Sequence, residues 1–195
     1  GAATLTLGGD VTLNVNGSGA TGANISDNLA LGAANRTFFV NDGAATNDLT
    51  VSGVISGARA IAKSNAGTLT LTGANTYTLT TTVNAGTLSF NTIANVSGGA
   101  SSLGAPTTVV NGTIALGAGT LLYTGSGNSS DRVINLTGAG TVDASGTGAL
   151  ILSGGVTGNT QNLTLTGTGS GTESGVINTT TGTLTKNGTG TWTLS

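Results

Sequence analysis

One stretch constrains this chain more than any other: residues 67–90, which read GTLTLTGANTYTLTTTVNAGTLSF. Apolar side chains alternate there with Thr, Ser or Asn, the period of two that is typical of a strand with one buried face. The alternating apolar residues are Leu69, Leu71, Val83, Leu88 and Phe90. Gly and Asn, which tolerate the positive φ of a sharp corner, recur at residues 73–75 and 84–86. The stretch therefore predicts three short strands separated by turns, which favours a coil of β-structure over a layered α/β domain.

The same residues resemble a known family. Gly67–Thr78 read GTLTLTGANTYT, and Thr81–Leu88 read TTVNAGTL. This two-part pattern is similar to the autotransporter-associated β-strand repeat of long passenger domains in bacterial surface proteins. Leu79 departs from that pattern, because the family usually has Gly there. The resemblance implies a right-handed parallel β-helix that is exported to the cell surface.

Composition indicates a packed, elongated core rather than disorder. Only 6% of the 195 residues are charged, against roughly 25% in an ordinary soluble protein. Hydrophobic residues make up 36% and are placed in regular alternation, so the abundance of Gly, Thr and Ser results from repetition. We expect a single β-solenoid domain over residues 1–195. A looser loop is expected near residues 91–106, where Ser, Gly and Ala gather around the single Pro.

The few charges and the lack of cysteine exclude several partners. Nucleic-acid binding needs a concentrated basic face, whereas the net charge is -2 and the basic residues are scattered along the chain. The five basic residues are Arg36, Arg59, Lys63, Arg132 and Lys186. There is no Cys, so neither a disulfide framework nor a thiolate metal site is available. No apolar run approaches the roughly 20 residues of a spanning helix, so we expect no membrane insertion of this segment.

Alternating patterns predict further strands on both sides of the central stretch. Near the start, the residues expected to face inward are Leu5, Leu7, Val11, Leu13 and Val15. Residues 36–40 (RTFFV) form a stronger strand pattern, and residues 59–63 are expected to be a short polar excursion, with a thin coil as the alternative. After the loop, residues 107–125 predict regular structure with a corner at Asn111-Gly112. Other predicted strands lie within residues 47–56, 132–136, 140–143, 148–153, 162–166, 175–178, 182–185 and 190–195.

A long internal repeat is visible. Residues 52–55 (SGVI) recur at 174–177, and the GTLTL of residues 67–71 recurs as GTWTL at 190–194. Lys63 and Lys186 are separated by the same offset of about 120 residues. The chain therefore contains about one and a half copies of a long unit.

The fold class that these patterns predict is all-β, a right-handed parallel β-helix (β-solenoid). Each strand would pair with its equivalent one coil away, about 4.8 Å distant, around a narrow aliphatic core. Parallel crossovers are right-handed in nearly all cases, which sets the expected hand. At roughly 20 residues per coil the chain would form about ten coils and a shaft of about 45–50 Å. The alternative fold is a pair of β-sandwiches, which short strands at regular spacing also permit.

Candidate chemistry is sparse. Gly17–Gly22 fit a dinucleotide fingerprint with Asp42 beyond it, but a Gly-rich chain produces that pattern by chance and no amphipathic helix follows. Asp42 and Asp48 flank a corner and are the candidate acid pair of a glycosidase or lyase, although Asp commonly caps turns. Asp131 beside Arg132 is expected to form a solvated ion pair. With no His and no Cys, the commonest catalytic groups are absent.

Two further patterns have ordinary explanations. Gly8-Gly9-Asp10 is a fragment of a calcium-binding repeat and is expected to be a turn. Outward Thr in Thr-Leu-Thr resembles ice-binding ranks, but Thr is simply a good strand former on a solvated face. We therefore predict no catalytic residue, no cofactor-binding residue and no metal ligand.

The leading functional hypothesis is a non-catalytic structural or adhesive element of the bacterial surface. Uncapped solenoid ends expose unpaired backbone groups, and joining Ser195 to Gly1 continues the strand rhythm, so copies could stack end to end through their terminal strands into a fibre. The alternative is an autotransporter passenger acting as an adhesin, or as a β-helix that binds or cleaves carbohydrate, with a surface or matrix polysaccharide as partner. That alternative predicts a groove with clustered acids and exposed aromatic residues.

Overall fold

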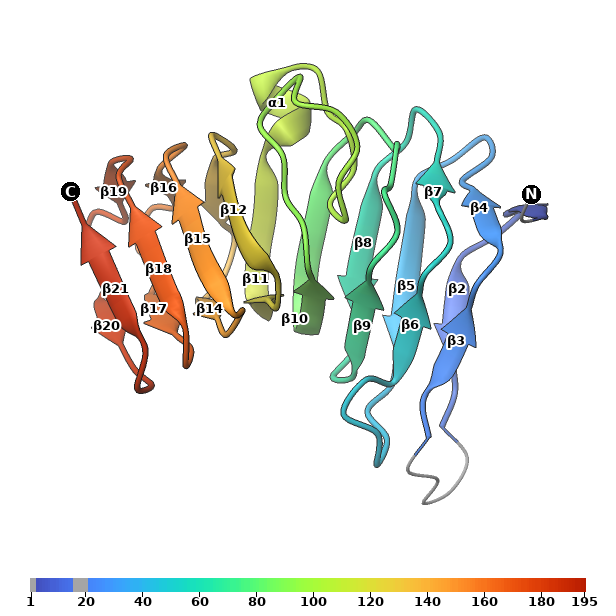
Figure 1. Ribbon diagram of the computed structural model, residues 1–195, viewed down its shortest axis with the longest axis horizontal. Coiled ribbons are helices and arrows are strands. Elements are labelled where there is room, and N and C mark those ends of the chain that lie inside the picture. The colour runs from blue at the N-terminus through green and yellow to red at the C-terminus, as the bar shows by residue number, and fades with distance from the viewer. Residues whose placement is uncertain (1–2, 16–20) are drawn as a thin grey trace.

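The computed structural model describes residues 3–15 and 21–195, which form a column of stacked β-coils (Figure 1). Every strand pair in it is parallel, and each strand pairs with its equivalent in the next coil. Three rows of strands run along the column, and we name them the first, second and third face. This arrangement confirms the predicted all-β parallel β-helix and rules out paired antiparallel sandwiches.

The strands of each face follow one another along the column. The first face holds β1 (Thr4–Thr6), β4 (Asn28–Ala30) and β7 (Ile55–Ser56), and, past the middle of the chain, β12 (Ser126–Ser130), β15 (Gly148–Leu152), β18 (Ser170–Glu173) and β21 (Thr191–Leu194). The second face holds β2 (Val11–Leu13), β5 (Arg36–Val40), β8 (Ile61–Ser64), β10 (Thr81–Phe90), β11 (Ile114–Tyr123), β13 (Ile134–Leu136), β16 (Val156–Thr157) and β19 (Ile177–Asn178). The third face holds β3 (Ala23–Ile25), β6 (Leu49–Val51), β9 (Thr68–Leu71), β14 (Gly140–Ala144), β17 (Leu163–Thr166) and β20 (Leu184–Lys186).

The two longest strands, β10 and β11, join the second face to the third. The first part of β10 pairs with β8 and its last part pairs with β9. The corner falls at residues 84–86, as the sequence predicts, where Gly86 has a φ of 66°. A Cβ on Gly86 would lie 2.4 Å from the Asn65 carbonyl oxygen of the coil below, so only Gly fits this corner.

The column has eight coils rather than the predicted ten, because the path of paired strands along the second face contains eight strands. Some coils match the expected length: Lys63 and its partner Val83 are 20 residues apart. Others are longer, since Val11 pairs with Phe38 and Val83 pairs with Leu116. Loops inserted at the corners lengthen these coils without adding height, so eight coils at about 4.8 Å give a shaft of about 35 Å.

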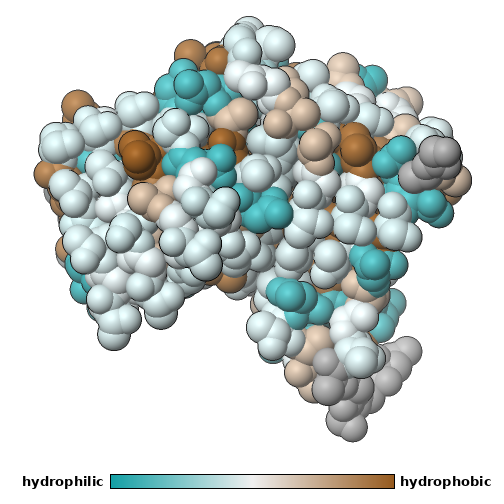
Figure 2. Space-filling model, in the orientation of Figure 1, coloured by the Kyte–Doolittle hydropathy of each residue, from teal (hydrophilic) through white to brown (hydrophobic). Residues whose placement is uncertain are grey.

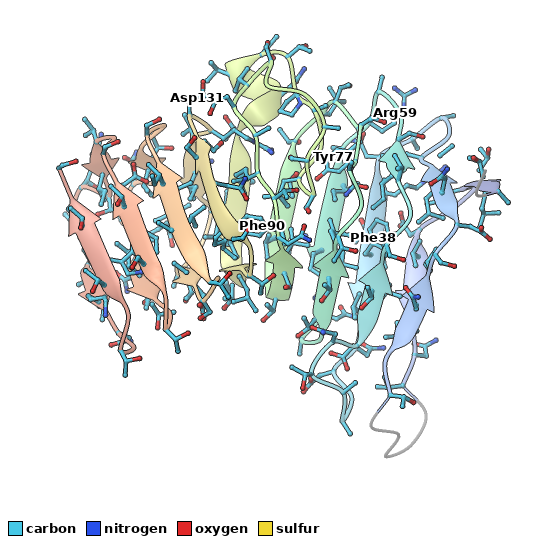
Figure 3. All side chains as sticks on the ribbon, viewed as in Figure 1. Phe38, Arg59, Tyr77, Phe90 and Asp131 are labelled. Carbon is cyan, nitrogen blue, oxygen red and sulfur yellow. The ribbon has the colours of Figure 1, made fainter. Side chains whose placement is uncertain are left out.

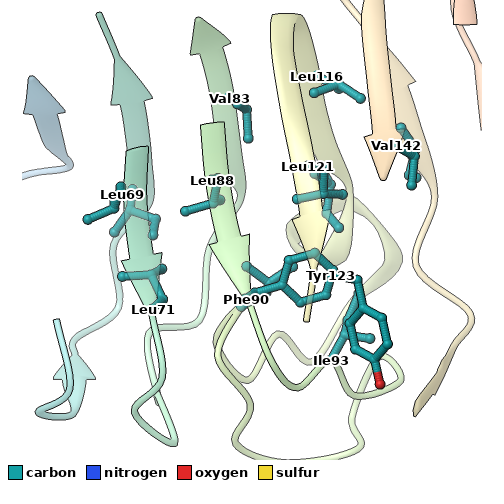
Figure 4. Packing of buried hydrophobic residues seen from close by; sticks show 14 of the residues in the cluster. Leu69, Leu71, Val83, Leu88, Phe90, Ile93, Leu116, Leu121, Tyr123 and Val142 are labelled. Atoms are coloured by element: carbon teal, nitrogen blue, oxygen red, sulfur yellow. The ribbon is translucent and has the colours of Figure 1, made fainter. Parts of the chain in front are cut away.

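Because successive side chains of a strand point to opposite sides, every second residue points into the core. Along the third face, Leu69 is in register with Leu88, Leu88 with Leu121, and Leu121 with Val142, so that equivalent side chains stack in a column (Figure 4). All four are at most 1% exposed. Burying each such side chain contributes about 1.5–3 kcal/mol, and every coil shares that burial with its neighbours. Phe90 and Tyr123 extend the column, with ring centroids 5.4 Å apart.

Leu5 faces inward as predicted, since it is in register with the buried Leu29, but it is 58% exposed because the first coil has a neighbour on one side only. Val15 lies beyond the end of β2 and is 37% exposed. Two other local predictions are wrong. Residues 59–63 are not a polar excursion but part of a regular coil, since β8 begins at Ile61 and Lys63 is 1% exposed. Asn111-Gly112 is not a strand corner but the end of the short helix α1 (Val109–Gly112), whose N-cap is Thr108.

The sequence repeat does not correspond to a whole number of coils. Leu69 lies on the third face, whereas its counterpart Trp192 lies on the first face. Lys63 lies on the second face and Lys186 on the third. The repeat thus conserves the strand-corner-strand unit and moves it on by one face.

The segment from residue 91 to residue 113 is the main departure from regular coils. In Figure 1 it runs upward from the end of β10 across the front of the molecule, between β7 and β12, and α1 lies at the top. Within the predicted loop at 91–106 the structure has no strand, only an isolated antiparallel bridge between Asn75 and Ser101. The segment is nevertheless well packed, because Ile93 and Leu103 are at most 3% exposed.

Candidate interaction surfaces

All five basic side chains donate hydrogen bonds to backbone carbonyls at the corners of the coils. Arg36 Nε donates to Leu31 O at 2.9 Å, and Arg36 Nη2 donates to Leu7 O at 2.6 Å. The exposed corners are held in the same way, by Arg59 to Ala58 O and by Lys186 to Gly188 O. Corners interrupt the strand ladders and leave carbonyl oxygens without an N–H partner, and a cation satisfies them.

Of the five basic side chains, Lys63 donates hydrogen bonds to the most carbonyls. Its Nζ donates to the carbonyls of Ser64, Asn65 and Ala85, at 2.9, 2.7 and 3.2 Å. Burial lowers the pKa of Lys63 to about 8, and the negative charge of Asp48 opposes that shift. The ammonium is therefore used inside the shaft and is not presented to a ligand.

Arg132 has the same role at the middle segment, so the predicted solvated pair with Asp131 is wrong. Arg132 is 1% exposed, and it donates from Nε to Gly112 O and from Nη1 to Leu103 O, both at 2.6 Å. It thereby ties α1 and the 91–106 segment to the shaft. Asp131 lies at the surface, near the top of Figure 3, and accepts a hydrogen bond from the Val96 N–H at 2.7 Å. Burial lowers the pKa of Arg132, with the nearby Tyr77 and Asp131 acting in the opposite direction.

The structure does not bring Asp42 and Asp48 together as a catalytic pair. Asp48 is 2% exposed and accepts hydrogen bonds from the N–H groups of Gly43 and Thr68, both at 2.8 Å. Asp42 is exposed on the loop between β5 and β6. One oxygen of Asp48 thus holds that loop, and the other holds the start of β9.

The other sequence candidates also fall on structural roles or outside the described residues. Asp10, after Gly8-Gly9, accepts a hydrogen bond from the Thr37 N–H of the next coil at 2.8 Å. Most of the Gly17–Gly22 motif lies outside the described residues. Within residues 3–15 and 21–195 there is no group of three His, Cys, Asp or Glu residues that could hold a metal ion.

Two hollows at the surface were not predicted from the sequence. The first is a groove of about 500 Å³, which we call the polar groove, and it is lined by Gly22, Ala23, Asn24, Ala45, Thr46, Asn47, Thr50 and Ser52. The loop between β5 and β6 forms one wall, and this loop extends below the strands at the lower right of Figure 1. The only sequence signal for it is the extra length of the coils between β2 and β8.

The second hollow, of about 470 Å³, lies at the C-terminal end of the column, and we call it the end hollow. It is lined by Glu173, Gly175, Ile177, Thr179, Leu184, Leu194 and Ser195. Leu184 and Leu194 are 43% and 50% exposed, and Val176 nearby is 79% exposed. Burial raises the pKa of Glu173, while hydrogen bonds from the Gly175 and Gly155 N–H groups oppose the shift.

Elsewhere the face shown in Figure 2 consists mostly of residues of intermediate or mildly hydrophilic hydropathy, and its hydrophobic patches are small and separate. Phe38, Tyr77 and Phe90 are at most 1% exposed, whereas Arg59 lies near the upper rim of the view in Figure 3. In the part of the chain that the structure covers, no helix is long and apolar enough to cross a membrane.

Stacked parallel coils with Gly/Asn corners, cation-capped carbonyls and an aliphatic core define a repeat protein of the β-solenoid class. A family model, described as the passenger-associated-transport-repeat, matches residues 61–90 and 184–195. These two segments contain Lys63 and Lys186, whose ammonium groups hydrogen-bond corner carbonyls. The chain is 32% identical over 135 residues to a protein named adhesin BmaC autotransporter, from Brucella suis biovar 1 (strain 1330). That alignment covers 68% of this chain and 4% of the adhesin. No solved structure matches the chain.

The chain therefore belongs to the autotransporter passenger repeat proteins. Its location is the extracellular face of the bacterial cell.

Proposed function

We propose that this segment is a non-catalytic, rigid shaft within a surface passenger. The observation that carries the proposal is the continuous hydrophobic column through successive coils, each joined to the next by parallel strand ladders. Such a column resists bending, because each coil is packed against both neighbours over its whole cross-section. The acids that a cleaving enzyme would need are exposed singly or consumed by backbone hydrogen bonds, which supports a role without catalysis.

Small-angle X-ray scattering of the monodisperse chain tests the shaft. We expect the scattering profile of a single rigid particle about 35 Å long on the shaft axis, and this profile should not change up to the onset of unfolding in urea. Scattering that indicates a bent or jointed particle would contradict the proposal.

We further propose that two copies associate end to end through the end hollow. Its exposed Leu184 and Leu194, together with the open edges of β19, β20 and β21, present the same apolar and hydrogen-bonding groups that each inner coil presents to its neighbour. A second copy whose first coil stacked on this edge would continue all three faces. Such head-to-tail contacts do not close and would give filaments.

Sedimentation velocity over a range of concentrations, with negative-stain electron microscopy, tests this association. We expect reversible growth that Leu194→Lys abolishes and that Ile151→Lys, at an exposed aliphatic residue on the side of the shaft, leaves intact. A chain that stays monomeric at high concentration would exclude stacking and would leave the shaft proposal standing.

A further inference from the structure

The polar groove differs from the rest of the surface because its wall is fixed by buried hydrogen bonds. The Asp48 carboxylate accepts from Gly43 N in the loop and from Thr68 N at the start of β9. The Asp48 carbonyl oxygen accepts from the Ala23 N–H of the first coil at 2.8 Å. One buried residue thus ties the wall to the coils on either side.

The first coil approaches this wall very closely. A Cβ on Gly22 would lie 1.9 Å from the Asn47 carbonyl oxygen, so any other residue at Gly22 would push the wall away. The groove is consequently formed before any ligand arrives, which reduces the entropy lost on binding. Its volume is about 500 Å³, and it is an open groove rather than an enclosed cavity.

The floor of the groove repeats with the coils. Asn24 of β3 is in register with Thr50 of β6, and Thr50 is in register with Thr70 of β9. Amide and hydroxyl groups are therefore presented at steps of about 4.8 Å along the axis. Thr70 Oγ1 donates to Asn47 Oδ1 at 3.0 Å, which orients the Asn47 amide at the junction of floor and wall.

The chemistry of the lining is neutral throughout. Its side chains are two carboxamides, three hydroxyls and two methyl groups, beside the bare backbone of Gly22. Carboxamides and hydroxyls both donate and accept hydrogen bonds, as sugar hydroxyls do. No charge is present for a phosphate or a carboxylate, and all five basic residues of the chain serve corner carbonyls elsewhere. A peptide side chain would find only alanine methyl groups and the methyls of Thr as apolar contacts.

We propose that the polar groove binds a neutral, unbranched oligosaccharide along the axis of the shaft. The chain of sugars lies across successive coils, with its hydroxyls bonded to Asn24, Thr50 and Asn47. This function is independent of the stiffness of the shaft and of end-to-end stacking. It also departs from the carbohydrate-binding or carbohydrate-cleaving alternative above, which predicts clustered acids and exposed aromatic residues, because this groove offers hydrogen-bonding amides and hydroxyls alone.

Titration calorimetry and amide NMR with three neutral hexasaccharides, cellohexaose, laminarihexaose and maltohexaose, test the proposal, with hexagalacturonate as the acidic comparator. We expect at least one neutral hexasaccharide to bind and to shift the amide resonances of residues 22–24 and 45–52. Thr50→Val removes one hydroxyl without changing shape and should weaken binding about 2- to 10-fold. Thr46→Ala removes a second hydroxyl, from the exposed loop, and should weaken it by a similar factor.

Thr82→Val is the matched control, because Thr82 is a half-buried outward residue at the equivalent position of the second face, away from the groove. It should leave the affinity unchanged, and the melting temperature of all three variants should match that of the native chain. The proposal is overturned if no neutral hexasaccharide shifts the groove resonances. It is equally overturned if hexagalacturonate binds as tightly, or if Thr82→Val weakens binding as much as Thr50→Val does.

Discussion

The middle of the shaft and its C-terminal coils solve the same packing problem with different side chains. Residues 133–172, all of which the structure describes, bury only aliphatic residues, Ala and Gly, and beyond them the buried polar residues are Glu173 and Thr179. Residues 75–132 bury a set of polar side chains: Asn75, Thr81, Ser89, Ser101, Ser102, Ser130 and Arg132. The backbone ladders of regular coils satisfy one another, whereas an inserted segment brings unpaired backbone groups into the core, and side chains must satisfy them.

The difference between the two regions can be tested most directly at Arg132. Arg132→Met keeps the volume but leaves the Gly112 and Leu103 carbonyls unpaired, so we expect the free energy of unfolding to fall by about 3 kcal/mol or more. Urea denaturation measures this loss. Lys186→Met is the control, because its exposed ammonium donates to one carbonyl in the regular coils, and it should cost less than about 1 kcal/mol. Equal losses would show that the middle segment does not depend on its buried cation.

A second test compares two asparagine residues. Asn75 is fully buried; its Oδ1 accepts from the Ile55 N–H and its Nδ2 donates to Ser102 O, both at 2.7 Å. Asn75→Ala should cost about 2–3 kcal/mol, since two buried backbone groups lose their partners. Asn162 accepts from the Thr183 N–H at 2.9 Å at an exposed corner of the regular coils, and Asn162→Ala should cost less than about 1 kcal/mol. Thermal unfolding followed by circular dichroism separates the two cases.

The pH dependence of stability sharpens the comparison further. The pKa of Lys63 is lowered to about 8 from 10.5, so between these values the unfolded chain binds more protons and stability rises with pH. The pKa of Tyr77 is raised to about 12 from 10.0, so the unfolded chain loses that proton first and stability falls above pH 10. We expect a rise of about 1 kcal/mol from pH 8 to pH 9, measured by urea denaturation. Lys63→Met should remove the rise, and a rise that persists in this variant would assign it to another group.

The smallest effect is expected at the end of the regular coils. The pKa of Glu173 is raised by burial, so the stability that it contributes is present at low pH and is lost as pH rises through the folded-state pKa. Glu173→Gln still accepts from the Gly175 N–H and carries no charge, so it should be more stable than the native chain at pH 7, by about 1 kcal/mol or less, and no more stable at pH 4. Scanning calorimetry at the two pH values checks this. A loss of stability at pH 7 would mean that the charge itself is needed there.

Much of the fold could be predicted because its code is local. The period-two alternation at residues 67–90 places Leu69, Leu88 and Phe90 in the core, as expected, and the corner at residues 84–86 lies where Gly and Asn allow it. The sequence predicts an external position for Lys63 because the residue is polar, and it does not show that three backbone carbonyls accept hydrogen bonds from the ammonium. The polar groove could not be predicted at all, because its floor comes from Asn24 and Thr50 in successive coils.

The sequence by itself determined the strand-corner-strand unit, its parallel stacking and its family. Only the tertiary structure decided how many residues each coil takes, which face each repeat occupies, and where residues 91–113 are inserted. The physical reason is range: alternation and turn preferences act within a few residues, whereas coil length is set by contacts such as Arg132 with Leu103 and Asn75 with Ser102, which join residues 27 or 29 positions apart.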